Sequence, residues 1–387
     1  MTNVRRMLAA LAVALPLLLI VAAGETGAEE ADVIHLRLLE TTDLHGFIMP
    51  YNYGQQKEVT TYGFALTASL IKQARSEVKN SLLFDIGDLL QGSYLDKFVA
   101  DKGLLPDEVH PMIRAMNLMG YDAATVGNHE FNYGIRFMNE ALDDANFPYV
   151  SANLFYDDKD KKAKNDIPYF RPYVMLNRTL RDENGQEHEL KIGVIGLTLP
   201  QTIAWNRRFE RLGGILKTKD IYKTAKKYVP IMKKEGADVI VALSHNGLGK
   251  PKVMKKNNET YSLTTIKGID AVMFGHIHKV FPSKTFAGIR GVNLEKGTIN
   301  GVAAVEAGRW GSHLGVIDLT LKKKKNDWKV VSSHAEARPV FDPKTGQARV
   351  QPNPEVVNAV HAIHEAALNY MLSPSSDFLR PQKSVQP

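Results

Sequence analysis

The stretch Tyr121-Asp122-Ala123-Ala124-Thr125-Val126-Gly127-Asn128-His129-Glu130 decides how the rest of this 387-residue chain is interpreted. The apolar run at 121–126 predicts a short buried strand, and Gly127 predicts a turn at its end. An amide, an imidazole and a carboxylate then follow at a sheet edge, where ligands collect. Taken alone, the tetrapeptide at 127–130 is more often a turn or a cap than a ligand set, so its meaning depends on the rest of the chain.

Four further polar motifs each follow an apolar run of the kind that forms strands, so five strand ends are expected to meet at one edge. The four motifs are Asp43-Leu44-His45, Gly87-Asp88, Ser244-His245-Asn246 and Gly275-His276-Ile277-His278. Carboxylate and imidazole ligands suit Mn, Fe, Co or Zn, and two such ions about 3.5–4 Å apart require a bridging carboxylate. We therefore expect a site for two divalent metal ions, with Asp88 as the bridge. Its seven expected ligands are Asp43, His45, Asp88, Asn128, His245, His276 and His278.

The order of these motifs resembles that of the calcineurin-like metallophosphoesterase superfamily. Three longer segments, at residues 40–46, 127–134 and 274–282, resemble one branch of its 5'-nucleotidase family. This branch contains periplasmic 2',3'-cyclic-nucleotide 2'-phosphodiesterase/3'-nucleotidases, and the similarity extends from about Ile34 to about Met371. The resemblance implies an α/β/β/α sandwich, in which two mixed sheets pack face to face with helices outside them.

The resemblance also implies how the site works. One ion would be held by Asp43, His45, Asp88 and His278, and the other by Asp88, Asn128, His245 and His276. Both ions would bind phosphoryl oxygens while a metal-activated water attacks phosphorus in line, and His129 would stabilise the developing charge or protonate the leaving oxygen. A 2',3'-cyclic nucleotide would give a 3'-nucleotide, which the same site would then dephosphorylate.

Asn132 departs from the pattern of the wider family. In 5'-nucleotidases this position is usually an Asp that pairs with the motif histidine, which is His129 here. An amide orients an imidazole but does not stabilise its cation by charge, so we expect His129 to act mainly as a hydrogen-bond donor to phosphate. The cyclic-phosphodiesterase branch resembles this chain at that position. His129 and Asn132 are therefore the predicted catalytic residues.

The N-terminus has the pattern of a secretory signal peptide. A short basic start precedes an apolar run at residues 7–23, and small residues permit cleavage after Ala23 or Ala28. We predict a signal peptide at 1–28 and a periplasmic or secreted protein without a stable membrane anchor. The alternative is an uncleaved anchor, although the run is at the short limit for spanning a bilayer. Because the chain has no cysteine, disulfides and thiolate metal ligands are excluded.

The formal net charge of +7 comes partly from Lys322-Lys323-Lys324-Lys325. This cluster lies between two strand-like runs, which predicts the solvated tip of a β-hairpin. Tethering of nucleic acid is the alternative, but a basic run alone is poor evidence of a binding face. A positive field favours small anionic phosphate esters, so we expect a nucleotide or another phosphate ester as substrate. We expect no binding of a nucleic acid polymer. We also expect a monomer.

We predict a catalytic domain at 31–350, a linker helix at 353–371 that begins with Asn353 and Pro354, and a disordered Ser/Pro-rich tail at 372–387. Relatives continue beyond such a helix into a second domain whose aromatic residues stack the nucleobase, so we expect this specificity domain to be absent. The chain should then hydrolyse small activated phosphodiesters and show little base preference. The alternatives are a broad-specificity phosphoesterase and a metal-binding remnant with little turnover.

The remaining pattern predicts strands at 34–41, 81–86, 148–154 and 190–197, and helices at 63–79 and 220–234. Two strands at 301–307 and 313–321 are expected to close a second sheet. Four polar residues outside the motifs are predicted not to be metal ligands. They are Asn153 in a turn, His313 in a structural position, and His361 and His364 on the surface of the linker helix.

Overall fold

The structure is a computed structural model that describes residues 32–160, 162, 164–206, 212, 214–249, 259–325 and 327–372. The predicted signal peptide and residues 373–387 of the predicted tail lie outside this part of the chain. Contacts divide the chain into residues Met1–Ala31 and Asp32–Pro387, and the description below concerns the second unit. Among the described residues, no helix combines the length and apolar character that a membrane-spanning segment requires.

The first sheet has five strands in the order β17-β16-β1-β4-β5. They are β1 (Val33–Thr41), β4 (Ser81–Asp85), β5 (Ala123–Ala124), β16 (His313–Lys324) and β17 (Asp327–Pro339). β4 pairs in parallel with β1 and β5, whereas β16 pairs antiparallel with β1 and β17, so the sheet is mixed. The strand predicted at 121–126 is present but forms a ladder only at Ala123 and Ala124.

The second sheet has the order β13-β14-β15-β11-β10-β8-β7, with β12 paired to β15. Its strands are β7 (Tyr173–Arg181), β8 (Glu187–Thr198), β10 (Val239–His245), β11 (Ala271–Phe274), β12 (Val280–Phe281), β13 (Val292–Asn293), β14 (Thr298–Ile299) and β15 (Val302–Ala307). Its centre, β8-β10-β11-β15, is parallel, and β7 pairs antiparallel with β8. Sequence analysis did not predict β7.

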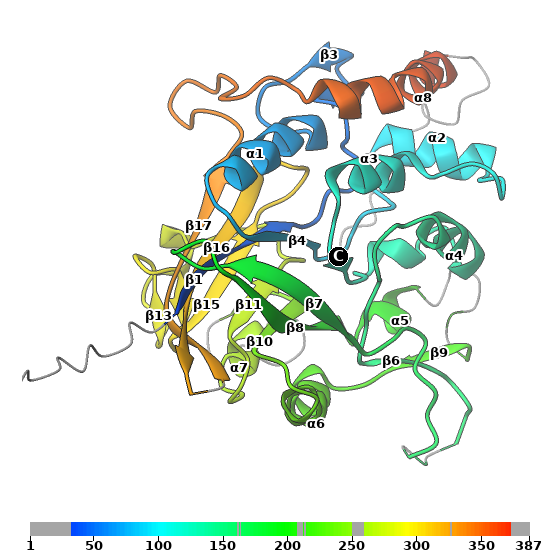
Figure 1. Ribbon diagram of the computed structural model, residues 1–387. Coiled ribbons are helices and arrows are strands. Elements are labelled where there is room, and N and C mark those ends of the chain that lie inside the picture. The colour runs from blue at the N-terminus through cyan, green and yellow to red at the C-terminus, as the bar shows by residue number, and fades with distance from the viewer. Residues whose placement is uncertain are drawn as a thin grey trace, which may run out of the picture. The chain divides into compact units, whose positions relative to one another are not determined.

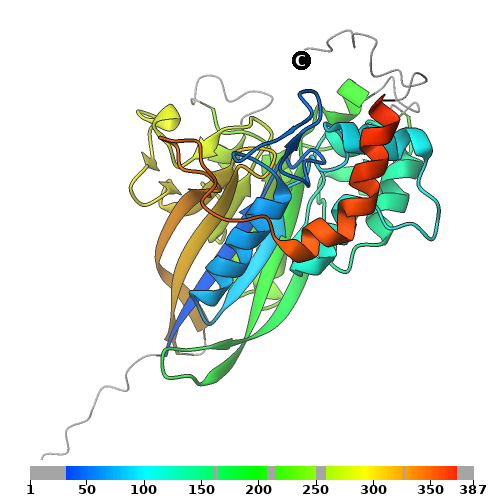
Figure 2. The same cartoon turned by 90° about the horizontal axis from the view of Figure 1, so that it is seen from above.

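The two sheets pack face to face and helices cover their outer faces (Figures 1 and 2). Leu36 and Leu38 of β1 lie in one buried cluster with Ile192 and Val194 of β8. Helices α1 (Phe64–Ser76), α3 (Pro111–Met119) and α8 (Pro354–Leu372) lie over the first sheet, and α6 (Ile221–Lys234) and α7 (Thr260–Leu263) lie over the second. The predicted α/β/β/α arrangement is confirmed.

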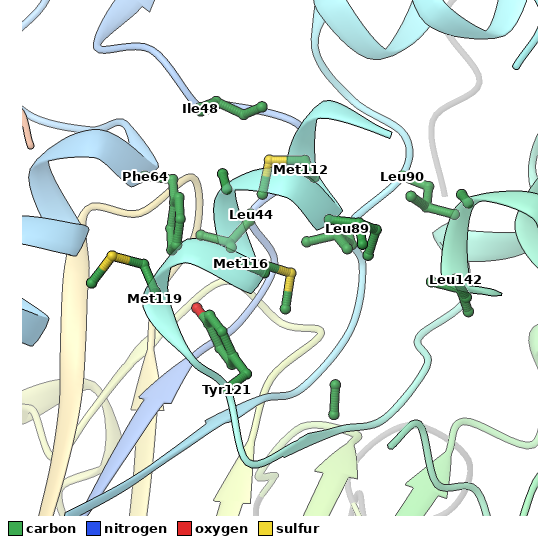
Figure 3. Packing of buried hydrophobic residues seen from close by; sticks show 14 of the residues in the cluster. Leu44, Ile48, Phe64, Leu89, Leu90, Met112, Met116, Met119, Tyr121 and Leu142 are labelled. Atoms are coloured by element: carbon green, nitrogen blue, oxygen red, sulfur yellow. The ribbon is translucent and has the colours of Figure 1, made fainter. Parts of the chain in front are cut away.

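The apolar layer beside α3 anchors the turns that follow β1 and β4 (Figure 3). Leu44 and Leu89 are each 1 % exposed and lie in the same buried cluster as Phe64, Met112 and Met116. Each leucine stands next to a predicted metal ligand in the sequence. Because burial fixes these leucine side chains, the neighbouring polar side chains are directed away from the core.

Shorter elements complete the fold. They are α2 (Tyr94–Lys102), α4 (Ile135–Asp143), α5 (Thr202–Trp205), β2 (Tyr51–Asn52), β3 (Lys57–Glu58), β6 (Leu154–Tyr156), β9 (Leu216–Thr218) and 3₁₀ turns at His129–Phe131 and Lys284–Phe286. Ser93 caps α2 with a reciprocal capping box. The hairpin predicted around Lys322-Lys323-Lys324-Lys325 is formed by β16 and β17.

The strand predicted at 148–154 is wrong for most of its length. The Val150 amide donates to Ala124 of the first sheet, whereas the Ala152 amide donates to Gly196 of the second. This segment therefore crosses from one sheet to the other, and its backbone donors are divided between them. Regular strand structure begins only at Leu154, in β6.

The predicted position of 313–321 is also wrong, because this strand belongs to the first sheet. Leu319 pairs with Leu36 and Val316 with Leu39, so β16 covers the edge of β1 that β4 leaves free. The strand at 301–307 does join the second sheet, as β15. The chain therefore changes sheets between β15 and β16, and the turn at this crossing lies beside the predicted metal ligands.

The linker helix begins as predicted, but one of its histidines is not at the surface. Asn353 accepts hydrogen bonds from the backbone amides of Glu355 and Val356 at the start of α8. His361 is exposed, in agreement with the prediction. His364 is 5 % exposed, and its Nδ1 lies 2.7 Å from the hydroxyl oxygen of Tyr53. The hydrogen bond and the packing of α8 explain why this polar residue is buried.

Candidate metal centre

Turns at the ends of β1, β4, β10 and β11, together with the turn after β5, carry the seven predicted ligands. Five of the seven have left-handed backbone conformations, which non-glycine residues rarely adopt. The φ angles are 50° at Asp43, 48° at His45, 58° at Asp88, 78° at His276 and 55° at His278. Sharp turns of this kind reverse the chain and bring successive polar side chains to the same edge.

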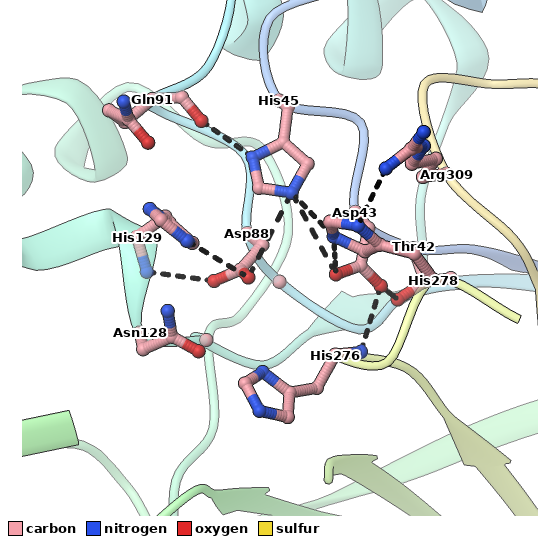
Figure 4. Close-up of polar contacts among 12 residues, drawn as sticks. Thr42, Asp43, His45, Asp88, Gln91, Asn128, His129, His276, His278 and Arg309 are labelled. Carbon is pink, nitrogen blue, oxygen red and sulfur yellow. Dashed lines mark hydrogen bonds and ion pairs between the residues drawn. The ribbon is translucent and has the colours of Figure 1, made fainter. Parts of the chain in front are cut away.

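The first group consists of Asp43, His45, Asp88 and His278, each of which offers one ligand atom within 4.8 Å of the others (Figure 4). Nε2 of His278 lies 3.2 Å from Oδ1 of Asp43 and 3.0 Å from Nε2 of His45. Three elements that are distant in sequence thus direct two carboxylates and two imidazoles at one point. This set could hold a divalent metal ion.

The second group consists of Asp88, His245 and His276, again with ligand atoms within 4.8 Å. Nε2 of His245 lies 3.0 Å from Oδ2 of Asp88. Asn128 is 6 % exposed, and its Oδ1 is buried without a hydrogen-bond partner among the described residues. Asp88 belongs to both groups, so the structure places it between them as the sequence predicts.

Backbone carbonyls fix the orientation of two of the imidazoles. Nδ1 of His45 lies 2.6 Å from the carbonyl oxygen of Gln91, and Nδ1 of His245 lies 2.8 Å from that of Ile86. A carbonyl oxygen only accepts, so each Nδ1 carries a proton and each Nε2 of a neutral ring keeps its lone pair. This outer hydrogen bond is typical of histidines that bind metal ions.

Electrostatics favours an ionised Asp88 at this edge, and it favours the neutral form of two of the imidazoles and the charged form of a third. Burial lowers the pKa of His45 and of His276 to about 4. Burial opposes ionisation of Asp88, yet His245 and His129 lower the pKa of this carboxyl well below its ordinary value. For His245 the effect of burial is outweighed by Asp88, which raises the pKa of the ring to about 10. An ionised carboxylate held in a buried site requires cations beside it.

The donor set fits divalent cations on independent grounds. Oδ1 of Asp43 and Oδ1 of Asn128 are buried and have no hydrogen-bond partner among the described residues. Buried polar atoms are normally satisfied, so one unpartnered oxygen in each of the two ligand sets indicates a bound group at each. Carboxylate, amide and imidazole donors together suit Mn, Fe, Co or Zn.

Glu130 organises the loops of the site, a role that sequence analysis did not assign to it. Its carboxylate is 1 % exposed and accepts hydrogen bonds from the backbone amides of Gly127, Asp88 and Leu89. These amides belong to the turns that follow β4 and β5. Glu130 therefore links the two turns through hydrogen bonds to their backbone amides. Its place in the 127–130 motif was the only sequence feature that could have indicated this role.

His129 and Asn132 make the predicted contact, and a third residue extends it. Nδ1 of His129 lies 2.6 Å from Oδ1 of Asn132, whose Nδ2 donates to Oδ1 of Asn206 at 2.6 Å. Nδ2 of Asn206 in turn donates to the carbonyl oxygen of Asn128 at 2.9 Å. The backbone amide of His129 donates to Oδ1 of Asp88 at 2.7 Å. Asn206, at the end of α5, carries no motif that could have identified it.

Asn153 and His313 lie outside both groups, as predicted. The Asn153 amide donates to the carbonyl oxygens of Thr198 and Lys219 and so braces the second sheet. His313 is half-buried, with Nδ1 2.9 Å from the Ser312 hydroxyl oxygen. Both side chains have structural roles.

Comparison with known proteins agrees with this geometry. The profile of the family described as calcineurin-like phosphoesterase matches residues 36–280. The chain is 42% identical over 350 residues to the 2',3'-cyclic-nucleotide 2'-phosphodiesterase/3'-nucleotidase of Yersinia enterocolitica, covering 90% of this chain and 52% of that protein. It is 40% identical to the trifunctional nucleotide phosphoesterase of Bacillus subtilis, covering 90% of this chain and 23% of that protein. The chain thus spans about half the length of the first of these relatives, and less of the second.

A solved structure shows the same similarity in three dimensions. The crystal structure of a calcineurin-like phosphoesterase from Bacillus subtilis superimposes with a TM-score of 0.81 and 38% sequence identity. The match covers 88% of this chain and 100% of that chain.

Proposed function

This chain belongs to the calcineurin-like phosphoesterase family, and on that basis we propose that it hydrolyses phosphate esters at the strand-end site. The observation that carries the proposal is the pair of Asp/His groups that share Asp88. A shared carboxylate is what two divalent ions a few ångströms apart require. The family places divalent metal chemistry in such a site, and the buried donors described above fit it.

In this proposal Asp43, His45, Asp88 and His278 hold one ion, and Asp88, Asn128, His245 and His276 hold the other. Bound ions would supply charge neutralisation for phosphoryl oxygens and an activated water. The carbonyls of Gln91 and Ile86 keep His45 and His245 in the tautomer that binds through Nε2. Glu130 holds the two turns that carry Asp88 and Asn128 at a fixed separation.

His129 is the proposed catalytic side chain outside the ligand set. It is about one-third exposed, and its Nε2 lies 4.0 Å from Oδ2 of Asp88, so the ring borders both the site and solvent. Oδ1 of Asn132 accepts a hydrogen bond from Nδ1–H of His129, which leaves Nε2 directed toward the reacting group. In its imidazolium form, with both ring nitrogens protonated, His129 would donate from Nε2 to a phosphoryl or leaving oxygen, and Asn132 and Asn206 would position it.

The proposed substrates are 2',3'-cyclic nucleotides, opened to 3'-nucleotides and then dephosphorylated to nucleosides. The support is the name carried by relatives that are 40–42% identical over about 90% of this chain. We also propose a protein in the periplasm or outside the cell, because residues 1–28 have the signal-peptide pattern. A monomer is proposed as well. A broad-specificity phosphoesterase, with the same ligands and less base preference, is the second candidate.

Steady-state kinetics would test these proposals. Purified protein would be stripped with chelator, reloaded with Mn, Co or Zn, and assayed on 2',3'-cyclic AMP, 3'-AMP and bis(p-nitrophenyl) phosphate. We expect turnover that depends on the added metal and a measurable rate on both nucleotides. Turnover of the aryl diester alone would favour the broad-specificity candidate. No turnover with any metal or substrate would leave a metal-binding protein without hydrolase activity.

A further inference from the structure

Arg309 is an exposed cation beside the first group of ligands. It lies in the turn between β15 and β16, where the chain crosses from the second sheet to the first. Its Nη1 lies 3.3 Å from Nδ1 of His278, and its guanidinium carbon lies 4.0 Å from the centre of the Trp310 ring. Within the described part of the chain these are its recorded side-chain contacts, and neither partner is a carboxylate.

Trp310 holds the guanidinium in a fixed place. The Trp310 amide donates to the carbonyl oxygen of Asp43 at 2.8 Å, and its own carbonyl accepts from Gly63 at 2.8 Å. The indole also packs on Phe47, with ring centres 4.6 Å apart. A cation stacked on such a ring loses part of its freedom before a ligand arrives, which favours binding.

The contact between Arg309 and His278 competes with metal ligation. A guanidinium only donates, so Nδ1 of His278 must accept and the neutral ring must carry its proton on Nε2. A histidine that binds an ion through Nε2 instead carries the proton on Nδ1. The two arrangements exclude each other, so when His278 acts as a ligand the guanidinium must turn to another acceptor close by.

We propose, on the basis of the function proposed above, that Arg309 binds a phosphoryl oxygen of the substrate when His278 serves as a metal ligand. In Figure 4 Arg309 and His129 lie on opposite sides of Asp88, so two donors would approach a bound phosphoryl group from two directions. The planar guanidinium matches phosphate geometry through two parallel hydrogen bonds. Arg309 thus has a positive charge without a carboxylate partner among the described residues, and it lies beside the ligand group. Its contact with His278 is lost when His278 binds a metal ion, which leaves the guanidinium available for phosphate.

The test measures binding of inorganic phosphate by calorimetry to Mn-loaded protein, with bound Mn determined for each sample. Arg309→Gln is expected to weaken phosphate binding by about 10- to 100-fold, as loss of a charged hydrogen bond predicts, with unchanged Mn content. Arg309→Lys should fall between, because a single ammonium replaces the fork. Arg181→Gln is the matched control. It removes the same charge from the β7–β8 hairpin, at the end of the sheet remote from Thr198 and His245.

Unchanged phosphate affinity in Arg309→Gln would overturn the inference, and so would wild-type protein that binds no phosphate. Loss of Mn in Arg309→Gln would also overturn it, because Arg309 would then support His278 as a ligand. Wild-type turnover of bis(p-nitrophenyl) phosphate is measured in parallel and reports on the proposed function separately. Phosphate binding that depends on Arg309 without such turnover would sustain the inference and reject the hydrolase.

Discussion

Asp85 and Asp88 stand three residues apart at the end of β4, and both are almost completely buried, yet their carboxyls behave in opposite ways. Burial raises the pKa of Asp85 to about 8. Burial acts on Asp88 as well, but His245 and His129 lower its pKa well below the ordinary value. The difference lies in the partners, because among the described residues Asp85 hydrogen-bonds to the Thr41 hydroxyl and the Gly87 amide and to no imidazole.

The same contrast divides the other buried carboxyls of the region. Asp43 lies beside His278 and has a lowered pKa despite its burial. Burial raises the pKa of Glu40 and of Glu306 well above the ordinary value, and both oxygens of Glu40 lack a hydrogen-bond partner among the described residues. Neighbouring imidazoles therefore favour the ionised form of a buried carboxyl, and burial without them favours the protonated form. Negative charge is concentrated at the strand ends, where cations would bind.

The largest effect is expected from removing the ionised member of the pair. Asp88→Ala should abolish turnover and reduce bound metal to half or less, because Asp88 is the carboxylate common to both groups. Metal analysis and kinetics on the reloaded protein check this. Asp85→Asn is the control three residues away and should keep both ions. Two full equivalents of metal in an active Asp88→Ala protein would contradict the site described here.

A variant at Glu130 tests whether this buried carboxyl stabilises the protein through its hydrogen bonds to backbone amides. Glu130→Ala would leave the amides of Gly127, Asp88 and Leu89 without their acceptor. Unsatisfied buried donors cost about 1–3 kcal/mol each, so the loss of folding stability should reach about 3 kcal/mol or more. Urea denaturation measures it, with the exposed Glu58→Ala on β3 as control. Equal stability of the two variants would mean that Glu130 does not clamp the turns.

Removal of His129, a neighbour of Asp88, is expected to reduce turnover less than removal of Asp88 itself. His129→Ala should lower kcat by about 100-fold or more, the range for loss of a general acid. Asn132→Ala should cost less, because Asn206 still holds the Asn128 carbonyl and the imidazole remains in place. Comparison of kcat for the two variants at equal metal content decides this. Equal losses would show that the Asn132 contact is as important as the ring.

Sequence analysis predicted which of these Asp and His side chains lie together, because they stand in turns directly after strands. The motif positions fixed which residues meet, since parallel strand ends share one edge. Sequence analysis failed for residues whose hydrogen-bond partner is distant in the sequence and is brought close only by packing of the fold. Nothing near Asn206 indicates that it meets Asn132, a residue 74 positions away in the chain. His364 was placed at the surface because its partner Tyr53 lies 311 positions away in the sequence, in the turn after β2.

Strand assignment failed for a related reason. The run at 313–321 has the alternation of a half-buried strand, but alternation does not state which sheet the strand joins. That choice depended on the free edge of β1. The segment at 148–154 has strand-like composition, yet its amides bond to both sheets.

The last expected effect concerns Asp85 and tests the protonated side of the comparison through the pH dependence of stability. Below about pH 4 Asp85 is protonated in both the folded and the unfolded chain, so it contributes no pH dependence. Between about pH 4 and its folded pKa of about 8, the unfolded chain releases this proton and the folded chain keeps it. Ionisation then favours the unfolded state, so this contribution to stability falls as pH rises and becomes constant above about pH 8.

Asp85→Asn removes that contribution and keeps the shape. Its amide oxygen can accept from Gly87, and its nitrogen can donate to the Thr41 hydroxyl, which is free to donate to Tyr121. Stability of the variant relative to wild type should therefore increase between pH 5 and pH 8, by at most about 1.4 kcal/mol per pH unit. Urea denaturation of both proteins at four pH values measures the difference. Parallel curves would show that Asp85 is already ionised in the folded protein, and the contrast with Asp88 would then not arise from the imidazoles.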